Sequence, residues 1–511
     1  DTVPLTGVIS LNNITKAFPG VVANDDISLD LVSGQVHCLL GENGAGKSTL
    51  ISILAGMQLP DSGTITIDGE TVSIGSPKIA MRHGIGVVHQ HSTLVPSLTV
   101  IENLMLGETG LLLKEKEARS RLDELSALLG ISIDPRTLAS DLGLGQQQQV
   151  EIAKAMWKGS RLLILDEPTS ALTPSAIENL AESIGRLTER GLGVVFITHK
   201  LREAYSMGDC VTVLRSGKKV GFLSPERMKE LDEDQAQAEI LRAMFGEDLR
   251  KAGTLDEAAD LAGATEATRE VAPVDLSDRP VVIELDDVTS SGRTTDVMVK
   301  EVSLRIRSGE IFGIAGIDGH GQTGLAEVVA GQRAAVQGSV RLEGKDITRT
   351  GVRDRQELGV RYVTDDRLHE APVGNLSAAL NFVLKAKQLI DEYSIRTPSP
   401  STRAAALSGG NIQKILLARE LAPGAKVVVV NKPTYGLDLK TVRLVHDLLR
   451  EFAAGGGAVL LISTELDELV ELSHRIGVIS KGEIVGVVDN DGVNTAEKVG
   501  QYMIGGTHAG N

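Results

Sequence analysis

The residues of this chain best suited to chemistry form a glycine-rich loop that runs directly into a lysine and a serine. Glycines let backbone amides approach phosphate oxygens, a lysine reaches the terminal phosphates of a nucleotide, and a serine hydroxyl at a helix start can ligate Mg²⁺. The apolar run 36–40 predicts a strand before the loop, and 48–55 predicts a helix after it. We therefore predict a nucleotide-binding loop made by Gly41, Asn43, Gly44, Ala45, Gly46, Lys47, Ser48 and Thr49.

Two further apolar runs end in polar side chains. Residues 161–166 predict a strand that ends at Asp166 and is followed by Glu167, an arrangement in which one carboxylate holds a metal and the next activates a water. Residues 193–198 predict another strand, followed by His199, a candidate to contact the γ-phosphate. Alone, such carboxylates are usually solvated and such a histidine is usually structural. The loop upstream favours the chemical interpretation. Phe18 is a candidate to stack on an adenine ring, with a core position as its alternative.

The same motifs occur twice along the chain. Lys47 and Gln322 are 275 residues apart, as are Gln90 and Asp365, whereas Asp166 and Asn431 are 265 apart, as are His199 and Thr464. A constant offset indicates a duplicated domain whose second copy is ten residues shorter in one subregion. We expect domains at 5–225 and 280–490, a linker at 226–279 and a tail at 491–511. The linker combines a helix-forming segment with an acidic, alanine-rich stretch and is predicted to be a solvated tether.

Composition narrows the function classes. A chain of 511 residues with 42% hydrophobic residues is long enough for two α/β cores. A net charge of −16 argues against a nucleic-acid-binding surface. Apolar runs are strand-sized, so we expect the chain not to cross a membrane, and the N-terminus resembles a cytosolic start. The two cysteines lack metal-ligand spacing, which favours a reducing compartment.

In their order, these motifs resemble those of ABC-type ATPase subunits with two fused nucleotide-binding domains. The LSGGN stretch 407–411 and the LGLGQ stretch 142–146 resemble the ABC signature, Gln90 matches the Q-loop, and 170–173 and 435–438 match the D-loops. The resemblance implies two tandem P-loop NTPase domains, each a RecA-like α/β core with an antiparallel β subdomain and a helical subdomain. It also implies ATP hydrolysis with Mg²⁺.

The stretches FPGVVANDDISL, FITHKL and LSGGNIQK are similar to fused ATPases of importers for simple sugars and nucleosides. VVHQHSTLVPSLTV and VNKPTYGLDLK are most similar to the nucleoside branch. This implies two transmembrane permease subunits, gripped by the helical subdomain after the Q-loop, and indirectly a lipoprotein or periplasmic substrate-binding protein. The expected location is the cytoplasmic face of a bacterial membrane.

In this family the two domains pair head to tail, so each ATP lies between the P-loop of one domain and the signature of the other. The resemblance implies that one composite site is complete. It has Phe18 for adenine, Lys47, Gln90, Glu167 and His199 for catalysis, Ser48, Gln90 and Asp166 for the metal, and Ser408, Gly409 and Gly410 from the second signature. The other site has Gln322, Thr323, Asp365, Asn431, Lys432 and Thr464, closed by Gly143 and Leu144.

All the severe changes thus fall in one of the two composite sites. Lys432 replaces a general base with a cation, so we expect hydrolysis at the first site and little or none at the second. Whether the second site binds nucleotide stays open.

Two other functions are compatible with parts of this pattern. Soluble ABC proteins of ribosomes or DNA also lack membrane spans, but they usually keep two competent sites, and ribosome-binding members have a long charged helical connector. A regulatory protein that binds ATP without turnover fits the second half but not Asp166 and Glu167. The sequence does not identify the transported solute.

Overall fold

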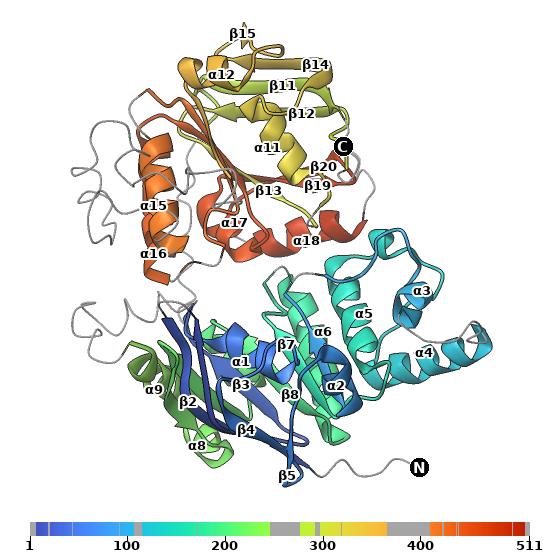
Figure 1. The fold of residues 1–511 in the computed structure, drawn as a ribbon. Helices are drawn as coiled ribbons and strands as arrows, with labels where there is room; N and C mark the ends of the chain where they lie inside the picture. The colour runs from blue at the N-terminus through green and yellow to red at the C-terminus, as the bar shows by residue number, and fades with distance from the viewer. Residues whose placement is uncertain are drawn as a thin grey trace. The chain divides into compact units, whose positions relative to one another are not determined.

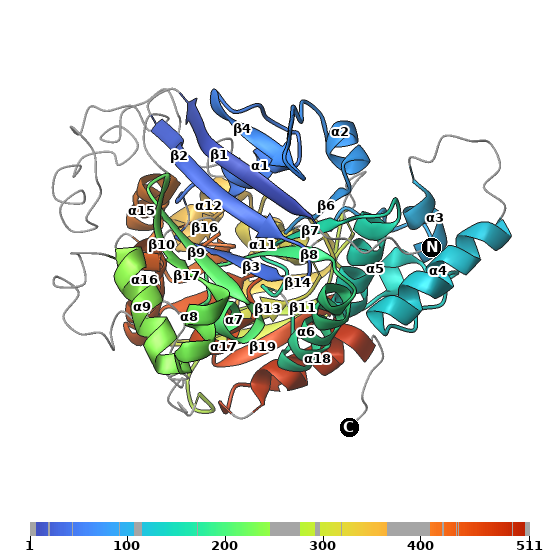
Figure 2. The same cartoon turned by 90° about the horizontal axis from the view of Figure 1, so that it is seen from below.

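The computed structural model describes residues 7–18, 21–42, 44–90, 92–106, 115–170, 172–245, 276–291, 297–317, 319–364, 409–421, 424–435, 437, 439–492 and 494–505. The chain divides into two compact units, residues 1–267 and 268–511. Figures 1 and 2 show each unit as layers of sheet and helix. Among the described residues, no helix is both long and apolar enough to cross a bilayer.

The first unit is built around a six-stranded sheet with strand order β10-β9-β3-β8-β7-β6. Its pairs are parallel except at the edge, where β10 runs antiparallel to β9. All five residues of β3 and all six of β8 are buried, because a parallel sheet covered on both faces requires continuous apolar strands. The strands are β3 (Val36–Leu40), β6 (Ile85–Val88), β7 (Leu162–Asp166), β8 (Gly193–Thr198), β9 (Cys210–Arg215) and β10 (Lys218–Leu223).

A second, antiparallel sheet of the first unit has the order β2-β1-β4-β5. Alternate residues of its long strands are buried, as expected for a sheet with one face on the core. Its strands are β1 (Val8–Phe18), β2 (Val21–Val32), β4 (Ser62–Ile67) and β5 (Glu70–Val72).

Among the helices of the first unit, α3, α4 and α5 contact one another and lie together in Figure 1. The others lie beside the sheets. The helices are α1 (Lys47–Leu54), α2 (Pro77–Arg82), α3 (Val100–Met105), α4 (Glu115–Leu129), a 3-10 turn (Ala139–Asp141), α5 (Leu144–Met156), α6 (Pro174–Glu189), α7 (Leu201–Met207), α8 (Pro225–Glu230) and α9 (Glu233–Phe245).

Helices α8 and α9 fall in the range expected to be a linker, yet α9 is packed against the first unit. Its residues Ala236, Ile240, Leu241 and Met244 are buried, and the last three belong to the same apolar core as β9. Their spacing places them on one face of the helix. The packed part of the first unit therefore extends to Phe245, beyond the expected boundary at 225, and a solvated tether does not describe residues 226–245.

The second unit repeats both sheets. Its six-stranded sheet has the order β16-β17-β18-β13-β19-β20, and its four-stranded sheet has the order β12-β11-β14-β15. Strand for strand, these are the orders of the first unit, as expected for a duplicated domain. The expected fold class, two tandem α/β domains with antiparallel β subdomains, is confirmed. The residues expected to form the second helical subdomain, within 366–408, lie outside the described residues.

The bounds of the second unit's elements are as follows. Its strands are β11 (Val281–Ser290), β12 (Val302–Arg307), β13 (Ile311–Ala315), β14 (Ala335–Leu342), β15 (Lys345–Asp346), β16 (Val360–Val363), β17 (Val427–Asn431), β18 (Ala458–Ile462), β19 (Arg475–Ser480) and β20 (Glu483–Asp489). Its helices are α11 (Gln322–Ala330), α12 (Val352–Leu358), α15 (Gly409–Glu420), α16 (Leu439–Ala454), α17 (Leu466–Leu472) and α18 (Thr495–Gly505).

Candidate functional site

The glycine-rich loop of the first unit connects the end of β3 to the start of α1. Gly44 and Gly46 have φ angles of +85° and +102°, which only glycine adopts without strain. A Cβ on Gly46 would also lie 2.2 Å from the carbonyl oxygen of Ala23. The loop therefore holds a fixed shape next to the N-terminus of α1, where free backbone amides favour an anion.

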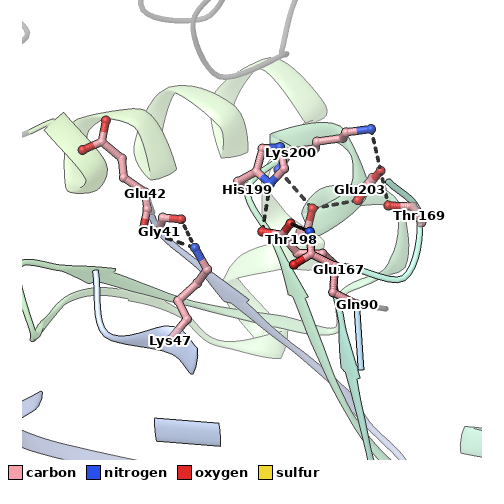
Figure 3. A network of polar contacts seen from close by, with 10 residues as sticks. All are labelled: Gly41, Glu42, Lys47, Gln90, Glu167, Thr169, Thr198, His199, Lys200 and Glu203. Carbon is pink, nitrogen blue, oxygen red and sulfur yellow. Dashed lines mark hydrogen bonds and ion pairs between the residues drawn. The ribbon is translucent and has the colours of Figure 1, made fainter. Parts of the chain in front are cut away.

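Lys47 is the first residue of α1 and is only 5% exposed. Its Nζ donates hydrogen bonds to the carbonyl oxygens of Gly41 and, at 3.2 Å, of Glu42 (Figure 3). Burial lowers the pKa of Lys47, and the carboxylates of Glu167 and Asp166 partly oppose this. A buried ammonium group at a helix N-terminus fits a phosphate, because an anion there compensates for the desolvation of the lysine.

The predicted general base, Glu167, is brought together with Gln90 and His199. The Nε2 of Gln90 donates to Glu167 Oε2 at 3.1 Å, and His199 Nδ1 lies 3.1 Å from Glu167 Oε1. Gln90 follows β6, Glu167 follows β7 and His199 follows β8. Because parallel neighbours end at the same edge of a sheet, these side chains meet there, as Figure 3 shows.

The two carboxylates of this edge differ in their acidity. Burial and the charge of Glu167 raise the pKa of Asp166. Burial also opposes ionisation of Glu167, but its hydrogen bond with His199 and the positive charges of Lys47 and Lys200 lower its pKa overall. Glu167 is thus held as a carboxylate, the form that accepts a proton, while Asp166 is a carboxylate that a divalent cation would stabilise.

Glu167 is also one of the few non-glycine residues with a left-handed backbone, with φ of +46°. Its amide donates to the carbonyl oxygen of Ile197 in the neighbouring strand at 3.0 Å. Such a conformation costs roughly 1–2 kcal/mol, so it persists only where the surroundings hold it. In this position it turns the Glu167 side chain toward His199.

The remaining predicted residues of the first site are placed as follows. Phe18 ends β1 and is 39% exposed, so it is not a core residue, and Lys16 Nζ lies 5.8 Å from the centre of its ring. Ser48 is exposed in the first turn of α1. Gly409 and Gly410 begin α15. Asn43 and Ser408 lie outside the described residues.

The loop of the second unit has the same backbone shape without the lysine. Gly319 and Gly321 have φ angles of +84° and +112°, and α11 begins at Gln322. The Nε2 of Gln322 donates to the carbonyl oxygen of Ile317 at 2.8 Å, the repeat equivalent of the bond from Lys47 to Glu42. The amide therefore replaces the internal contact of the lysine but not its charge.

In the second unit, Asn431 and Lys432 replace the two carboxylates that end β7 and follow it in the first unit. Asn431 ends β17, and its Nδ2 lies 3.5 Å from Thr323 Oγ1. The buried oxygens Asn431 Oδ1 and Gln322 Oε1 have no hydrogen-bond partner among the described residues. Lys432 keeps the left-handed backbone of Glu167, with φ of +46°. The turn survives, but Asn431 and Lys432 supply neither the metal-binding carboxylate nor the general base that Asp166 and Glu167 supply in the first unit.

The other residues assigned to the second site are placed as follows. Thr464 is partly buried two residues after β18. Gly143 caps α5, and its amide donates to Gln146 Oε1 at 3.2 Å, while Leu144 is the first residue of that helix. Asp365 lies outside the described residues.

Sequence reasoning missed one buried group at the first site. Glu203 accepts hydrogen bonds from Thr169 and Thr198, which flank the catalytic candidates Glu167 and His199. The signal was present in the repeat, because Glu203 and Glu468 are 265 residues apart and both are glutamate.

Comparison with known proteins identifies the family to which the chain belongs. The sequence pattern of the family described as ABC transporter matches residues 24–170 and 299–435. The nucleoside import ATP-binding protein NupA of Lactococcus lactis is 37% identical, with 98% of each chain covered. The guanosine import ATP-binding protein NupO of Bacillus subtilis is 38% identical, again with 98% of each chain covered. The ribose import ATP-binding protein RbsA 1 of Rubrobacter xylanophilus is 37% identical, with 94% of each chain covered. The chain therefore belongs to the ABC transporter family and is an ABC-type ATPase that uses ATP and Mg²⁺.

Proposed function

We propose that this chain is the ATP-hydrolysing motor subunit of an importer for nucleosides or simple sugars. The observation that carries the proposal is near-full-length similarity to nucleoside, guanosine and ribose import proteins, together with one complete set of catalytic side chains. The soluble alternative, action on ribosomes or nucleic acid, gains no support from these three relatives.

In the proposed reaction, different side chains of the first unit bind the phosphates, the adenine base and the metal ion. Lys47 and the amides around Gly44 and Gly46 bind and orient the phosphates, and Phe18 stacks on the base. Ser48, Gln90 and Asp166 would supply the oxygen donors that hold Mg²⁺, and the bound ion would neutralise phosphate charge. Hard oxygen donors and a carboxylate with a raised pKa fit this ion.

Glu167 acts as the general base. Its Oε1 and Oε2 are oriented by His199 and Gln90, and its lowered pKa keeps it ionised at neutral pH. It takes the proton of a water as that water's oxygen bonds to the γ-phosphorus and the bond to ADP breaks. His199 lies beside this carboxylate and is positioned to steady the developing charge.

We further propose that the two halves pair head to tail, so that Ser408, Gly409 and Gly410 complete the first site. The support is the distribution of the changes, since Gln322, Asn431, Lys432 and Thr464 in one half and Gly143 and Leu144 in the other would all share the second site. That site would then hold its shape without turnover.

The proposed partners are two transmembrane permease subunits and, through them, a substrate-binding protein, with the motor at the cytoplasmic face of the membrane. ATP hydrolysis by the purified chain should rise when its cognate permease subunits and solute-loaded binding protein are added. Full turnover without partners would contradict the importer assignment, and co-sedimentation with ribosomes would favour the alternative. The solute that the binding protein carries decides between a nucleoside and a pentose.

A further inference from the structure

Glu203 is a buried carboxylate that lies beside the proposed catalytic pair without belonging to it. It is in the first turn of α7 and only 7% exposed. Oε1 accepts a hydrogen bond from Thr169 Oγ1 at 2.7 Å, and Oε2 accepts one from Thr198 Oγ1 at 2.7 Å. Each carboxylate oxygen thus accepts a hydrogen bond from one threonine, and Lys200 Nζ also lies 3.6 Å from Oε1, as Figure 3 shows.

The two threonines lie on the two chain segments that carry the catalytic pair. Thr169 follows Glu167 by two residues, and Thr198 ends β8 immediately before His199. The Thr198 hydroxyl also accepts a hydrogen bond from the amide of Lys200 at 3.0 Å, so it supports the backbone on both sides of His199. Glu203 therefore joins the segment after β7 to the segment after β8, at the level where Glu167 and His199 lie 3.1 Å apart.

The second half provides an internal comparison. Glu468 is the repeat equivalent of Glu203, and its Oε1 accepts a hydrogen bond from Thr434 at 2.7 Å. The equivalent of Thr198 is Ser463, whose hydroxyl accepts from the amide of Glu465 at 3.0 Å. However, Glu468 Oε2 has no hydrogen-bond partner within the described part of the chain, and His446 Nε2 lies 3.0 Å from Oε1 instead.

The described part of the second half therefore has no equivalent of the hydrogen bond between Glu203 and Thr198. In the first half, that hydrogen bond reaches the end of β8, just before His199. In the second half the pair itself is missing, since Lys432 and Thr464 stand in place of Glu167 and His199. The link from the glutamate to the first threonine remains in both halves, where the left-handed turn also remains. The hydrogen bond from the first threonine, Thr169 or Thr434, is therefore found in both halves together with the left-handed turn. The hydrogen bond from Thr198 is found only in the half that has the catalytic pair, among the described residues.

We propose that Glu203 is a positioning residue for ATP hydrolysis, acting through Thr198 to hold His199 against Glu167. This inference rests on the proposed function, because it takes Glu167 as the general base. Weakening the link lets His199 move from Glu167 while the phosphate-binding loop stays in place. The turnover number should therefore fall and the KM for ATP should stay nearly unchanged.

The test measures steady-state ATP hydrolysis by the full chain in two matched pairs of variants. Thr198→Val and Glu203→Gln each break the link in the first half, and Ser463→Ala and Glu468→Gln make the corresponding changes in the second. Loss of one hydrogen bond to a charged group predicts a roughly 10- to 100-fold lower kcat for the first pair, with KM within about twofold. The second pair should keep kcat within about twofold. Thermal unfolding of all four variants reports their folding.

Thr198→Ser distinguishes positioning from a general structural role, because it keeps the hydroxyl and removes only a methyl group. It should restore kcat to within about twofold of the wild-type value while KM for ATP stays unchanged. Equal losses of kcat in the two halves, or a Thr198→Ser variant as slow as Thr198→Val, would overturn the inference.

Glu167→Gln in the same assay distinguishes the positioning role of Glu203 from the assignment of Glu167 as the general base. If Glu167→Gln abolishes ATP hydrolysis but the Thr198 and Glu203 variants hydrolyse ATP at the wild-type rate, only the positioning role of Glu203 is wrong. If Glu167→Gln hydrolyses ATP at the normal rate, the proposed assignment of the base fails as well.

Discussion

Replacing Lys47 with glutamine gives the first unit the loop that the second unit already has. In the second unit, Gln322 donates to the Ile317 carbonyl oxygen at 2.8 Å and the glycines keep the same left-handed backbone. The Lys47→Gln variant should therefore keep the shape of its loop and lose only the charge and reach of the lysine. This makes it a test of the charge rather than of the fold.

The expected magnitudes follow from the surroundings of Lys47. A hydrogen bond to a charged group contributes about 1.5–3 kcal/mol, so ATP affinity should fall roughly 10- to 150-fold, and hydrolysis should fall by at least that factor. The melting temperature should not fall, because burial lowers the pKa of Lys47 and a neutral amide avoids the cost of burying a cation. Nucleotide titration, phosphate release and thermal unfolding measure these three quantities.

The reciprocal change, Gln322→Lys, serves as the matched control. Gln322 is only 4% exposed, and Asn431 and Lys432 stand where the first unit has two carboxylates. A lysine there is buried without those carboxylates, so the variant should be less stable and gain no hydrolysis. Wild-type hydrolysis by Lys47→Gln, or a large loss of its melting temperature, would refute this reasoning.

Three further predictions concern the stability of the second unit, the glycine-rich loop of the first unit and the stacking of Phe18 on the adenine base. Burial alone would lower the pKa of His446, but hydrogen bonds to Glu468 and its neighbour Glu471 raise it to about 9. Protonation of His446 in the folded state therefore stabilises the fold fully below about pH 6.5, and this stabilisation is lost as the pH rises toward 9. The difference in melting temperature between wild type and His446→Gln should therefore shrink from about pH 6.5 to about pH 9 when it is measured by thermal unfolding. Gly46→Ala should weaken ATP binding much more than Gly44→Ala in a titration, because a Cβ on Gly46 meets a backbone oxygen whereas one on Gly44 meets nothing within 4 Å. Phe18→Ala should weaken ATP binding by roughly 1–3 kcal/mol, the usual worth of stacking on a base, and Phe18→Tyr should keep it.

The parts of the site that the sequence predicted depend on local patterns. The apolar run 36–40 became β3, and α1 begins at Lys47 because the glycines before it permit the turn. The meeting of Gln90, Glu167 and His199 depends on three strands ending at one edge of the sheet. The sequence predicted the strands before Glu167 and His199, whereas Gln90 was assigned to the site only by its resemblance to the Q-loop.

Other features depend on packing that no local pattern specifies. The hydrogen bonds of Glu203 join residues from two different strand ends, and a charged residue in the first turn of a helix usually faces solvent. The core contribution of α9 was missed because an acidic, alanine-rich composition masks its one apolar face. Gln322 donates a hydrogen bond to the Ile317 carbonyl oxygen, so a neutral side chain makes the contact inside the second loop that Lys47 makes in the first. The loss of the lysine alone did not predict this contact.

We infer that Glu167 of the first unit supports all the ATP hydrolysis by this chain. The most direct measurement is the residual steady-state rate of Glu167→Gln in the full chain, alone and assembled with its permease subunits, with ATP binding checked in parallel. We expect a rate near zero with ATP binding retained, since Lys432 occupies the equivalent position in the second unit and a cationic side chain does not accept a proton from water. A residual rate near half of the wild-type rate would show turnover at the second site and contradict the claim.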